Sequence, residues 1–276
     1  MIKSYYLRLL VSLKRNGLFT TILSLPRKSL VIFRDLVPNK RRELIRKIQR
    51  EYTSILPWHY KFIGGYAIQK DSLKGSNKVA LCFGIYDDVN NEISLSRNGF
   101  KVYAFDPTPI TKNLFKNNPK FIEHIEYHPW AVWSENKEMK FFYKNNTQNR
   151  ENFEGTLEQI DHGDKYERVE AFSLQSIIKK LNINNIHYIK MDIEGAVPEV
   201  LNAYFLSNTD KNKYPYEISF ELEIPDNVLS NDSKEILEKI YILFNNLKKF
   251  YNVYHMPDDK AHGNIGIHAT RIDKES

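Results

Sequence analysis

The sequence predicts an α/β protein whose mainly parallel sheet carries helices on both faces. Three apolar runs have the character of buried strands: Val79–Phe83, Lys101–Phe105 and Tyr188–Met191. Each run is followed by a glycine or a carboxylate and then by a helical segment. Strands that alternate with helices imply a parallel sheet. Because such sheets bind ligands beyond the carboxyl ends of their strands, we expect one site across these three strand ends.

The individual elements follow from apolar periodicity and from the turn residues between the runs. Strands are expected at Lys78–Phe83, Lys101–Phe105, His124–His128, Met139–Tyr143, Ile186–Met191, Glu217–Leu222, Val253–Met256 and Ile265–Ala269. Helices are expected at Val89–Arg97, Pro109–Lys116, Phe172–Leu181, Ala196–Leu206 and Lys234–Phe250. The last two strands suit an antiparallel pair, and the polar residues 145–165 suit a long loop. Asp87 or Asp88 is the expected N-cap of the first helix.

Charge separates the chain into a basic arm and a domain. Residues 1–50 carry 13 Lys and Arg against Asp35 and Glu43, a net charge of +11, whereas the remainder carries −5. A length of 276 residues is enough for one domain with an appendage. We therefore expect a basic amphipathic helical arm at residues 1–55 and a domain at residues 56–276.

The arm has three interpretations. In Met1–Leu13 the apolar residues recur at helical spacing, and Lys3, Arg8 and Lys14 fall mainly on the other side. The helices either pack on the domain with a solvated basic face, or contact an anionic membrane, or bind nucleic acid. Nucleic acid is not expected, because no recognisable module accompanies the arm. No charge-free apolar stretch reaches the roughly 20 residues of a span, and no signal cleavage site is evident. We expect a cytoplasmic protein, peripheral at most at the inner face of the membrane.

The single cysteine, Cys82, excludes an internal disulfide and a cysteine-built zinc site. It lies within an apolar strand, so we interpret it as a packing residue.

The first strand–helix turn indicates which ligand the sheet binds. A dinucleotide site requires G-x-G-x-x-G, whereas this turn holds only Gly84. Asp87 and Asp88 stand where a phosphate would lie, and they suit instead a ligand with a cationic, amino-acid-like end. Asp106 follows Gly84 by 22 residues, the spacing of a ribose-binding acid at the end of a second strand. These features favour S-adenosylmethionine, and a nicotinamide-dependent oxidoreductase remains the alternative enzyme.

Three segments resemble the FkbM-type methyltransferases. They are Cys82–Asp88, Val102–Pro109 and Ile189–Ala196, of which the Lys-x-Asp-x-Glu-Gly-Ala run in the third is the most specific. The resemblance runs from about Lys78 to about Glu223 and leaves out the arm. It implies the Rossmann-like class I methyltransferase fold, S-adenosylmethionine as donor, and O-methylation, mostly of sugars and secondary metabolites. We therefore expect a sugar or glycolipid-type acceptor and a role in polysaccharide biosynthesis; a catalytically inactive, methyltransferase-like binding protein is the non-enzyme alternative.

The resemblance also implies a cofactor site. Gly84 and Asp87 or Asp88 would hold the methionine part, Asp106 the ribose, and Ala131 would lie near the adenine. Phe83 and Pro107, the neighbours of Gly84 and Asp106, complete this expected site. One position departs from the family, which often has Glu after Gly-Ala, where this chain has Val197.

Methyl transfer to oxygen needs an aligned hydroxyl and gains from a base that removes its proton. Asp192 is the candidate base, and Glu194 either shares this role or raises the pKa of Asp192 by like charge. The alternative is structural: Asp192 would cap the following helix, and Glu194 would favour its positive end.

Other polar residues are weaker candidates. Glu221 and Glu223 end a strand on one face and would contact the substrate or form an edge salt bridge. His128 and His262 would approach the substrate or remain surface or strand-end residues. Asp192, Glu194 and Glu221 could together offer oxygen ligands to a hard cation, but their spacing fits no specific site and no metal is expected. Trp130 and Trp133 suit the core better than a ligand contact.

Overall fold

A computed structural model of the chain describes residues 40–75, 77–143, 155–156, 165–208, 210–224, 231–256 and 264–272. The chain divides into two compact units, Met1–Glu43 and Leu44–Ser276, and every described strand lies in the second. The arm helices predicted before residue 40 lie outside the described residues. The division into an arm of residues 1–55 and a domain of residues 56–276 stays a prediction.

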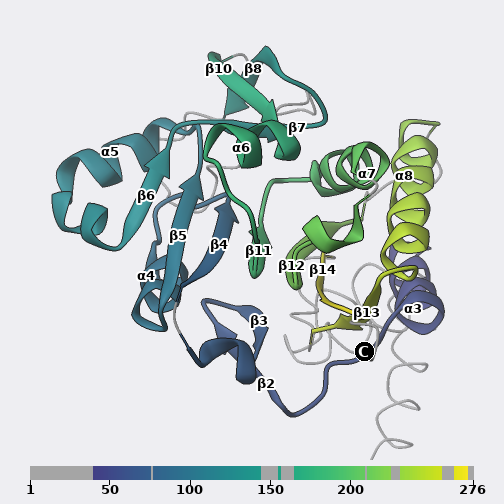
Figure 1. Ribbon diagram of the computed structural model, residues 1–276. Helices are drawn as coiled ribbons and strands as arrows, with labels where there is room; N and C mark the ends of the chain where they lie inside the picture. The colour runs from purple at the N-terminus through teal and green to yellow at the C-terminus, as the bar shows by residue number, and fades with distance from the viewer. Residues whose placement is uncertain are drawn as a thin grey trace, which may run out of the picture. The chain divides into compact units, whose positions relative to one another are not determined.

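The described residues form a central eight-stranded sheet (Figure 1). Its strands, in spatial order, are β1 (Ser54–Ile55), β13 (Tyr251–His255), β14 (Asn264–Arg271), β12 (Glu217–Glu223), β11 (Tyr188–Met191), β4 (Lys78–Phe83), β5 (Phe100–Phe105) and β6 (Ile125–His128). The run from β12 to β6 is parallel throughout, and β14 is antiparallel to both of its neighbours. The predicted Rossmann-like architecture, with its antiparallel strand pair, is confirmed.

The register of three parallel strands places their carboxyl ends at one level. Phe83 of β4 pairs with Met191 of β11 on one side and with Phe105 of β5 on the other. The residues that come next, Gly84, Asp192 and Asp106, therefore meet at the same edge of the sheet.

Helices cover both faces of the sheet (Figure 1). One face packs against α3 (Lys40–Tyr52), α6 (Leu174–Lys180), α7 (Val197–Ser207) and α8 (Asn231–Leu247). The other packs against α4 (Asn90–Arg97), α5 (Pro109–Asn117) and the hairpin of β2 (Tyr60–Ile63) and β3 (Tyr66–Gln69). Because side chains alternate along a strand, Leu81 and Phe83 lie on the first face and Cys82 lies on the second. Cys82 is fully buried, which raises the pKa of its thiol and agrees with the predicted packing role.

Smaller elements complete the domain. The β2–β3 hairpin joins β2 (Tyr60–Ile63) to β3 (Tyr66–Gln69), and a second sheet has the order β7 (Ala131–Trp133), β10 (Lys165–Ser173), β8 (Lys137–Tyr143), β9 (Gly155–Thr156). Short 3₁₀ helices lie at η1 (Asp71–Leu73), η2 (Pro119–Glu123) and η4 (Lys211–Lys213). No helix in the described ranges is both long and apolar enough to cross a membrane.

The predicted bounds of two helices were wrong by up to three residues: Lys234–Phe250 is observed as Asn231–Leu247, and Phe172–Leu181 as Leu174–Lys180. The helix expected from Phe172 begins at Leu174, because the backbone stays extended through Ser173, whose hydroxyl accepts the Ser176 N–H as an N-cap. Phe172 belongs to strand β10, which the sequence analysis did not predict. The predicted loop at residues 145–165 lies mostly outside the described residues.

Candidate functional site

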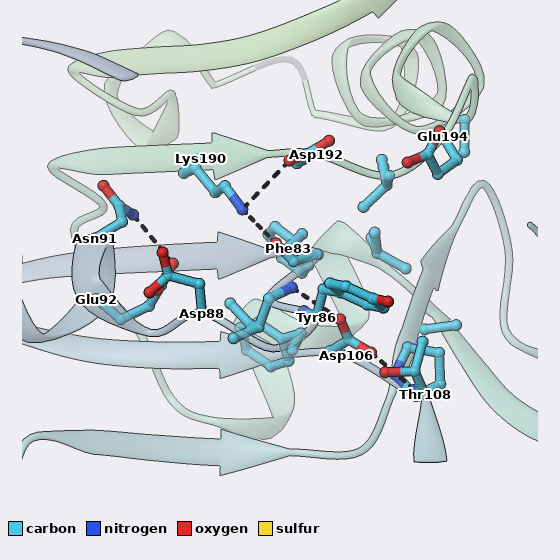
Figure 2. A pocket seen from close by; sticks show the side chains of 18 of the residues that line it. Phe83, Tyr86, Asp88, Asn91, Glu92, Asp106, Thr108, Lys190, Asp192 and Glu194 are labelled. Atoms are coloured by element: carbon cyan, nitrogen blue, oxygen red, sulfur yellow. Dashed lines mark hydrogen bonds and ion pairs between the residues drawn. The ribbon is translucent and has the colours of Figure 1, made fainter. Parts of the chain in front are cut away.

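A cavity of about 420 Å³ lies at the carboxyl ends of β4, β5 and β11 (Figure 2). Helix α4, strand β7, strand β8 and the β2–β3 hairpin also contribute to its walls. All of the predicted cofactor and catalytic residues line it, namely Phe83, Gly84, Asp87, Asp88, Asp106, Pro107, Ala131, Asp192 and Glu194. The structure thus brings together residues from 83 to 194 in one place, although what each of them binds stays a prediction.

Gly84 lets two strand ends approach closely. Its φ is 75°, and a Cβ atom built on it would lie 1.6 Å from the carbonyl oxygen of Asp192. The Asp192 N–H donates to the carbonyl of Phe83 at 3.0 Å, so the ends of β4 and β11 are bonded at this point. No residue with a side chain fits at position 84 without moving the strands apart.

Asp106 organises the turn that follows Gly84. Its Oδ2 atom accepts the N–H groups of Ile85 and Tyr86, both at 2.8 Å, and its Oδ1 atom accepts that of Thr108 at 2.7 Å. The side chain is only 3% exposed. A carboxylate has about four acceptor positions, so about one remains for the ribose hydroxyl predicted here. The backbone contacts show a positioning role that the sequence did not predict.

The turn itself exposes two acids to the cavity. Tyr86 adopts a φ of 55°, unusual for a residue with a side chain, and the Thr111 hydroxyl donates to its carbonyl at 2.7 Å. Asp87 and Asp88 are exposed on the wall. Asp88 accepts the Asn90 N–H at 2.8 Å, but the N-cap position of α4 is occupied by Val89, with no side-chain cap. The predicted acidic N-cap was therefore wrong by one residue.

Lys190 and Asp192 form a charged pair at the end of β11. The Lys190 side chain is buried, and its ammonium group donates to the carbonyl of Gly84. The same ammonium lies 4.0 Å from Asp192 Oδ2, whose side chain is 40% exposed (Figure 2). Lys190 therefore braces the turn after β4 and holds positive charge beside the predicted base.

Tyr66, from the β2–β3 hairpin, is a site residue that sequence reasoning missed. It lines the cavity, and its ring lies 5.1 Å from the Lys190 ammonium. Burial raises its pKa far above the ordinary value, as do the charge of Asp192 and a hydrogen bond with that carboxylate. Tyr66 is therefore a neutral phenol that donates to Asp192. No local pattern marks it, because its role depends on the hairpin meeting β11 in space.

Glu194 lies apart from the Lys190–Asp192 pair. Figure 2 shows it on the opposite side of the cavity from Asn91 and Glu92. It has a φ of 44° in the turn that leads to α7. The N-cap of α7 is Ala196, without a side-chain cap, so Asp192 does not cap this helix. The structural alternative for Asp192 is thereby removed.

The weaker candidates lie around the cavity or outside the described residues. Glu221 and Glu223 do not line it; Glu221 Oε1 accepts from Asn264 Nδ2 at 2.7 Å. His262 lies outside the described residues.

His128 stacks on Trp130 at 4.4 Å, and burial lowers its pKa. Trp130 lines the cavity, whereas Trp133 is buried in the core of the second sheet. Among the residues that can be described, no group of three or more acidic, His or Cys side chains could hold a metal ion.

The cavity wall is strongly acidic. Among the residues that the structure describes, it carries six carboxylates, those of Asp87, Asp88, Glu92, Asp106, Asp192 and Glu194, against the one ammonium group of Lys190. Such a wall suits a ligand that carries positive charge and disfavours a pyrophosphate. The sulfonium and ammonium groups of S-adenosylmethionine meet this requirement, so the residues present fit that cofactor.

The family model described as "Methyltransferase FkbM domain" matches residues 75–238. No curated protein matches the chain. Similar solved structures include a fibrillarin pre-rRNA processing protein of Methanococcus jannaschii, with 12% identity, a TM-score of 0.42, and coverage of 78% of this chain and 71% of that one. Another is SMU.1697c, a putative methyltransferase of Streptococcus mutans in complex with SAH, with 7% identity, a TM-score of 0.38, and coverage of 86% and 100%. Identities and TM-scores this low support no functional conclusion for this chain.

Proposed function

The chain belongs to the family of FkbM methyltransferase domains, and we propose that it methylates a hydroxyl of a sugar or of a glycan or glycolipid precursor. Membership makes it an S-adenosylmethionine-dependent methyltransferase. The proposal of a hydroxyl acceptor is supported chiefly by Asp192, a partly exposed carboxylate on the cavity wall at the end of β11. A carboxylate in that place suits an acceptor that must lose a proton, as a hydroxyl does.

The side chains around the cavity divide the work of such a reaction. S-adenosylmethionine, when bound, supplies an electrophilic methyl group on its sulfonium. Asp192 accepts the proton of the acceptor hydroxyl, while Tyr66 and Lys190 hold its carboxylate in place. Phe83, Phe105 and Trp130 give the cavity an apolar wall that limits the access of water. Alignment of the hydroxyl with the methyl group supplies most of the remaining rate.

The variant Asp192→Asn tests the assigned base. It keeps the shape of the side chain and an acceptor for Tyr66, so binding of S-adenosylhomocysteine should change less than about threefold. The rate of transfer to a sugar acceptor should fall on the order of 10²–10⁴-fold. The measurement is transfer of labelled methyl from S-adenosylmethionine to a panel of glycosides, nucleotide sugars and lipid-linked saccharides.

The control is Asp210→Asn, which removes an exposed carboxylate paired with Lys213 at 3.9 Å and should leave both quantities unchanged. An Asp192→Asn enzyme of wild-type rate would exclude Asp192 as the base. Transfer only to non-hydroxyl acceptors would exclude O-methylation. A wild-type chain that binds donor and transfers to nothing in the panel would favour the inactive, binding-protein alternative.

We also propose that the basic arm contacts an anionic membrane surface where a lipid-carried acceptor is presented. The support is the net charge of +11 in residues 1–50. The full chain should sediment with vesicles containing anionic lipid at low salt, and not with zwitterionic vesicles, because salt and charge govern such contacts. Replacement of Lys3, Arg8, Lys14 and Arg15 by Gln should weaken this binding. A full chain that ignores anionic vesicles at low salt would contradict the proposal.

A further inference from the structure

Helix α4 places a buried carboxylate and a buried amide at one side of the cavity. Glu92 is 1% exposed and Asn91 is 6% exposed, and both line the cavity. The Asn91 Nδ2 atom donates to Glu92 Oε1 at 3.0 Å and lies 4.0 Å from the Sγ atom of Cys82 (Figure 2). The amide thus fixes the orientation of the carboxylate and uses its own donors in doing so.

This arrangement leaves two acceptors without donors. Glu92 Oε2 and Asn91 Oδ1 are both buried, and neither accepts a hydrogen bond from any residue that the structure describes. Buried carboxylate oxygens are rarely left in this state, because the loss of hydration is costly. Two adjacent acceptors on residues that line a cavity call for a ligand with several N–H donors and positive charge.

The protein's own cation at this site is engaged elsewhere. The Lys190 ammonium donates to the Gly84 carbonyl and lies beside Asp192, and no ion pair joins it to Glu92 in the described part of the chain. Strand β4 contributes no carboxylate of its own, since its six residues, Lys78–Phe83, include neither Asp nor Glu. The acid at this side of the cavity therefore comes from the helix.

We infer that Glu92, oriented by Asn91, binds the ammonium group at the methionine end of S-adenosylmethionine. The inference rests on the use of that donor by this family of enzymes. A primary ammonium has three donors, which suits Glu92 Oε2 and Asn91 Oδ1 together. Glu92 is buried, whereas Asp87 and Asp88 are exposed to solvent. Because charges attract more strongly away from water, Glu92 should bind the ammonium group most strongly of these three carboxylates. The sequence predicted that Gly84 and Asp87 or Asp88 hold the methionine part of the cofactor, and the inference adds Glu92, which the sequence did not indicate.

The test compares two ligands in two proteins. The ligands are S-adenosylhomocysteine and its deaminated analogue, which lacks only the amino group, and their dissociation constants are measured by calorimetry. The variant is Glu92→Gln in the full chain, which keeps an acceptor for Asn91 but removes the charge. Wild type should prefer S-adenosylhomocysteine over the analogue by about 10–100-fold, as a charge-assisted hydrogen bond implies. In Glu92→Gln this preference should fall to less than about threefold, because only the binding of the aminated ligand weakens.

The controls separate contact from structure. Glu123→Gln removes an exposed acid that does not line the cavity and should preserve the preference. The thermal midpoint of ligand-free Glu92→Gln should not fall, since the variant removes a buried charge that no cation of the described residues pairs with and keeps an acceptor for the Asn91 amide. Equal weakening of both ligands with a lower midpoint would make Glu92 a structural residue and overturn the inference. A preference for S-adenosylhomocysteine that is unchanged in Glu92→Gln would also overturn the inference. If wild type binds neither ligand, the donor assignment itself fails, which is a different result from failure of the subsite.

Discussion

Tyr66 is a residue of the candidate site that lies outside the family motifs. It comes from β3, before the matched residues 75–238, and its hydroxyl hydrogen-bonds with the predicted base, Asp192. Burial holds the phenol neutral by raising its pKa well above the ordinary value. Its contribution is therefore to orient the Asp192 carboxylate, not to exchange protons itself.

The variant Tyr66→Phe should lower the rate of methyl transfer by about 3–30-fold, because Asp192 loses a hydrogen bond worth about 1–2 kcal/mol. Donor affinity should change little, since the ring and its contact with Lys190 remain. The measurements are kcat under saturating acceptor and the dissociation constant of S-adenosylhomocysteine. Tyr60→Phe is a matched control: that hydroxyl bonds to Thr270 and does not line the cavity. A Tyr66→Phe enzyme with unchanged kcat would show that Asp192 needs no such support.

At the scale of elements, the turn between β4 and α4 is set by three separate contacts. Gly84 admits the Asp192 carbonyl, Asp106 accepts the N–H groups of the next two residues, and Lys190 donates to the Gly84 carbonyl. These contacts come from β5 and β11, the two neighbours of β4 in the sheet. The turn is therefore built only when all three strands are in register.

The variant Gly84→Ala should destabilise the fold by about 3 kcal/mol or more, because its Cβ would overlap the carbonyl oxygen of Asp192, a residue whose N–H is bonded to the Phe83 carbonyl. Gly65→Ala separates this overlap from backbone strain. Gly65 has a similar φ, +87°, with nothing within 4 Å of its added Cβ, so only about 1 kcal/mol is expected. Urea unfolding of both variants gives the comparison. Equal losses would mean that strain, and not the approach of the strands, explains the glycine.

The sequence predicted those elements whose signal is local. The strands β4, β5 and β11 are continuous apolar runs with a glycine or an acid after them, and all three lie within a residue or two of the expected bounds. By contrast, most of β10 has mixed charged and apolar residues that predicted no element, although it pairs with β8 along seven positions. The same difference decides which site residues could be predicted. Gly84, Asp106 and Asp192 directly follow predicted strands. Tyr66 and Glu92 have no such local signal, because their proposed roles depend on tertiary contacts.

At the scale of the whole molecule, a half-buried histidine at the end of the sheet opposite the cavity contributes to how stability depends on pH. His187 precedes β11, and its Nδ1 atom accepts the Val79 N–H at 3.2 Å, which requires a neutral imidazole with its proton on Nε2. Burial lowers the pKa of His187 below its ordinary value of 6.5, and the charges of Lys78 and Arg271 lower it further. His128, also half-buried, has a lowered pKa chiefly for the same reason.

The sign of the effect follows from linkage. Since the folded-state pKa of His187 lies below 6.5, the unfolded chain binds more protons in the window just below that value. Stability should therefore rise with pH through this window and be lost as the pH falls below about 6.5. The urea midpoint of wild type should decrease from pH 7.5 to pH 5.5. The decrease should be smaller for His187→Gln, whose amide oxygen can still accept the Val79 N–H. His128 should leave some pH dependence of stability in the His187→Gln variant. The control is His59→Gln, at an exposed position, which should behave as wild type. If His187→Gln lost as much stability as wild type, protonation at this end of the sheet would not control the acid sensitivity of the fold.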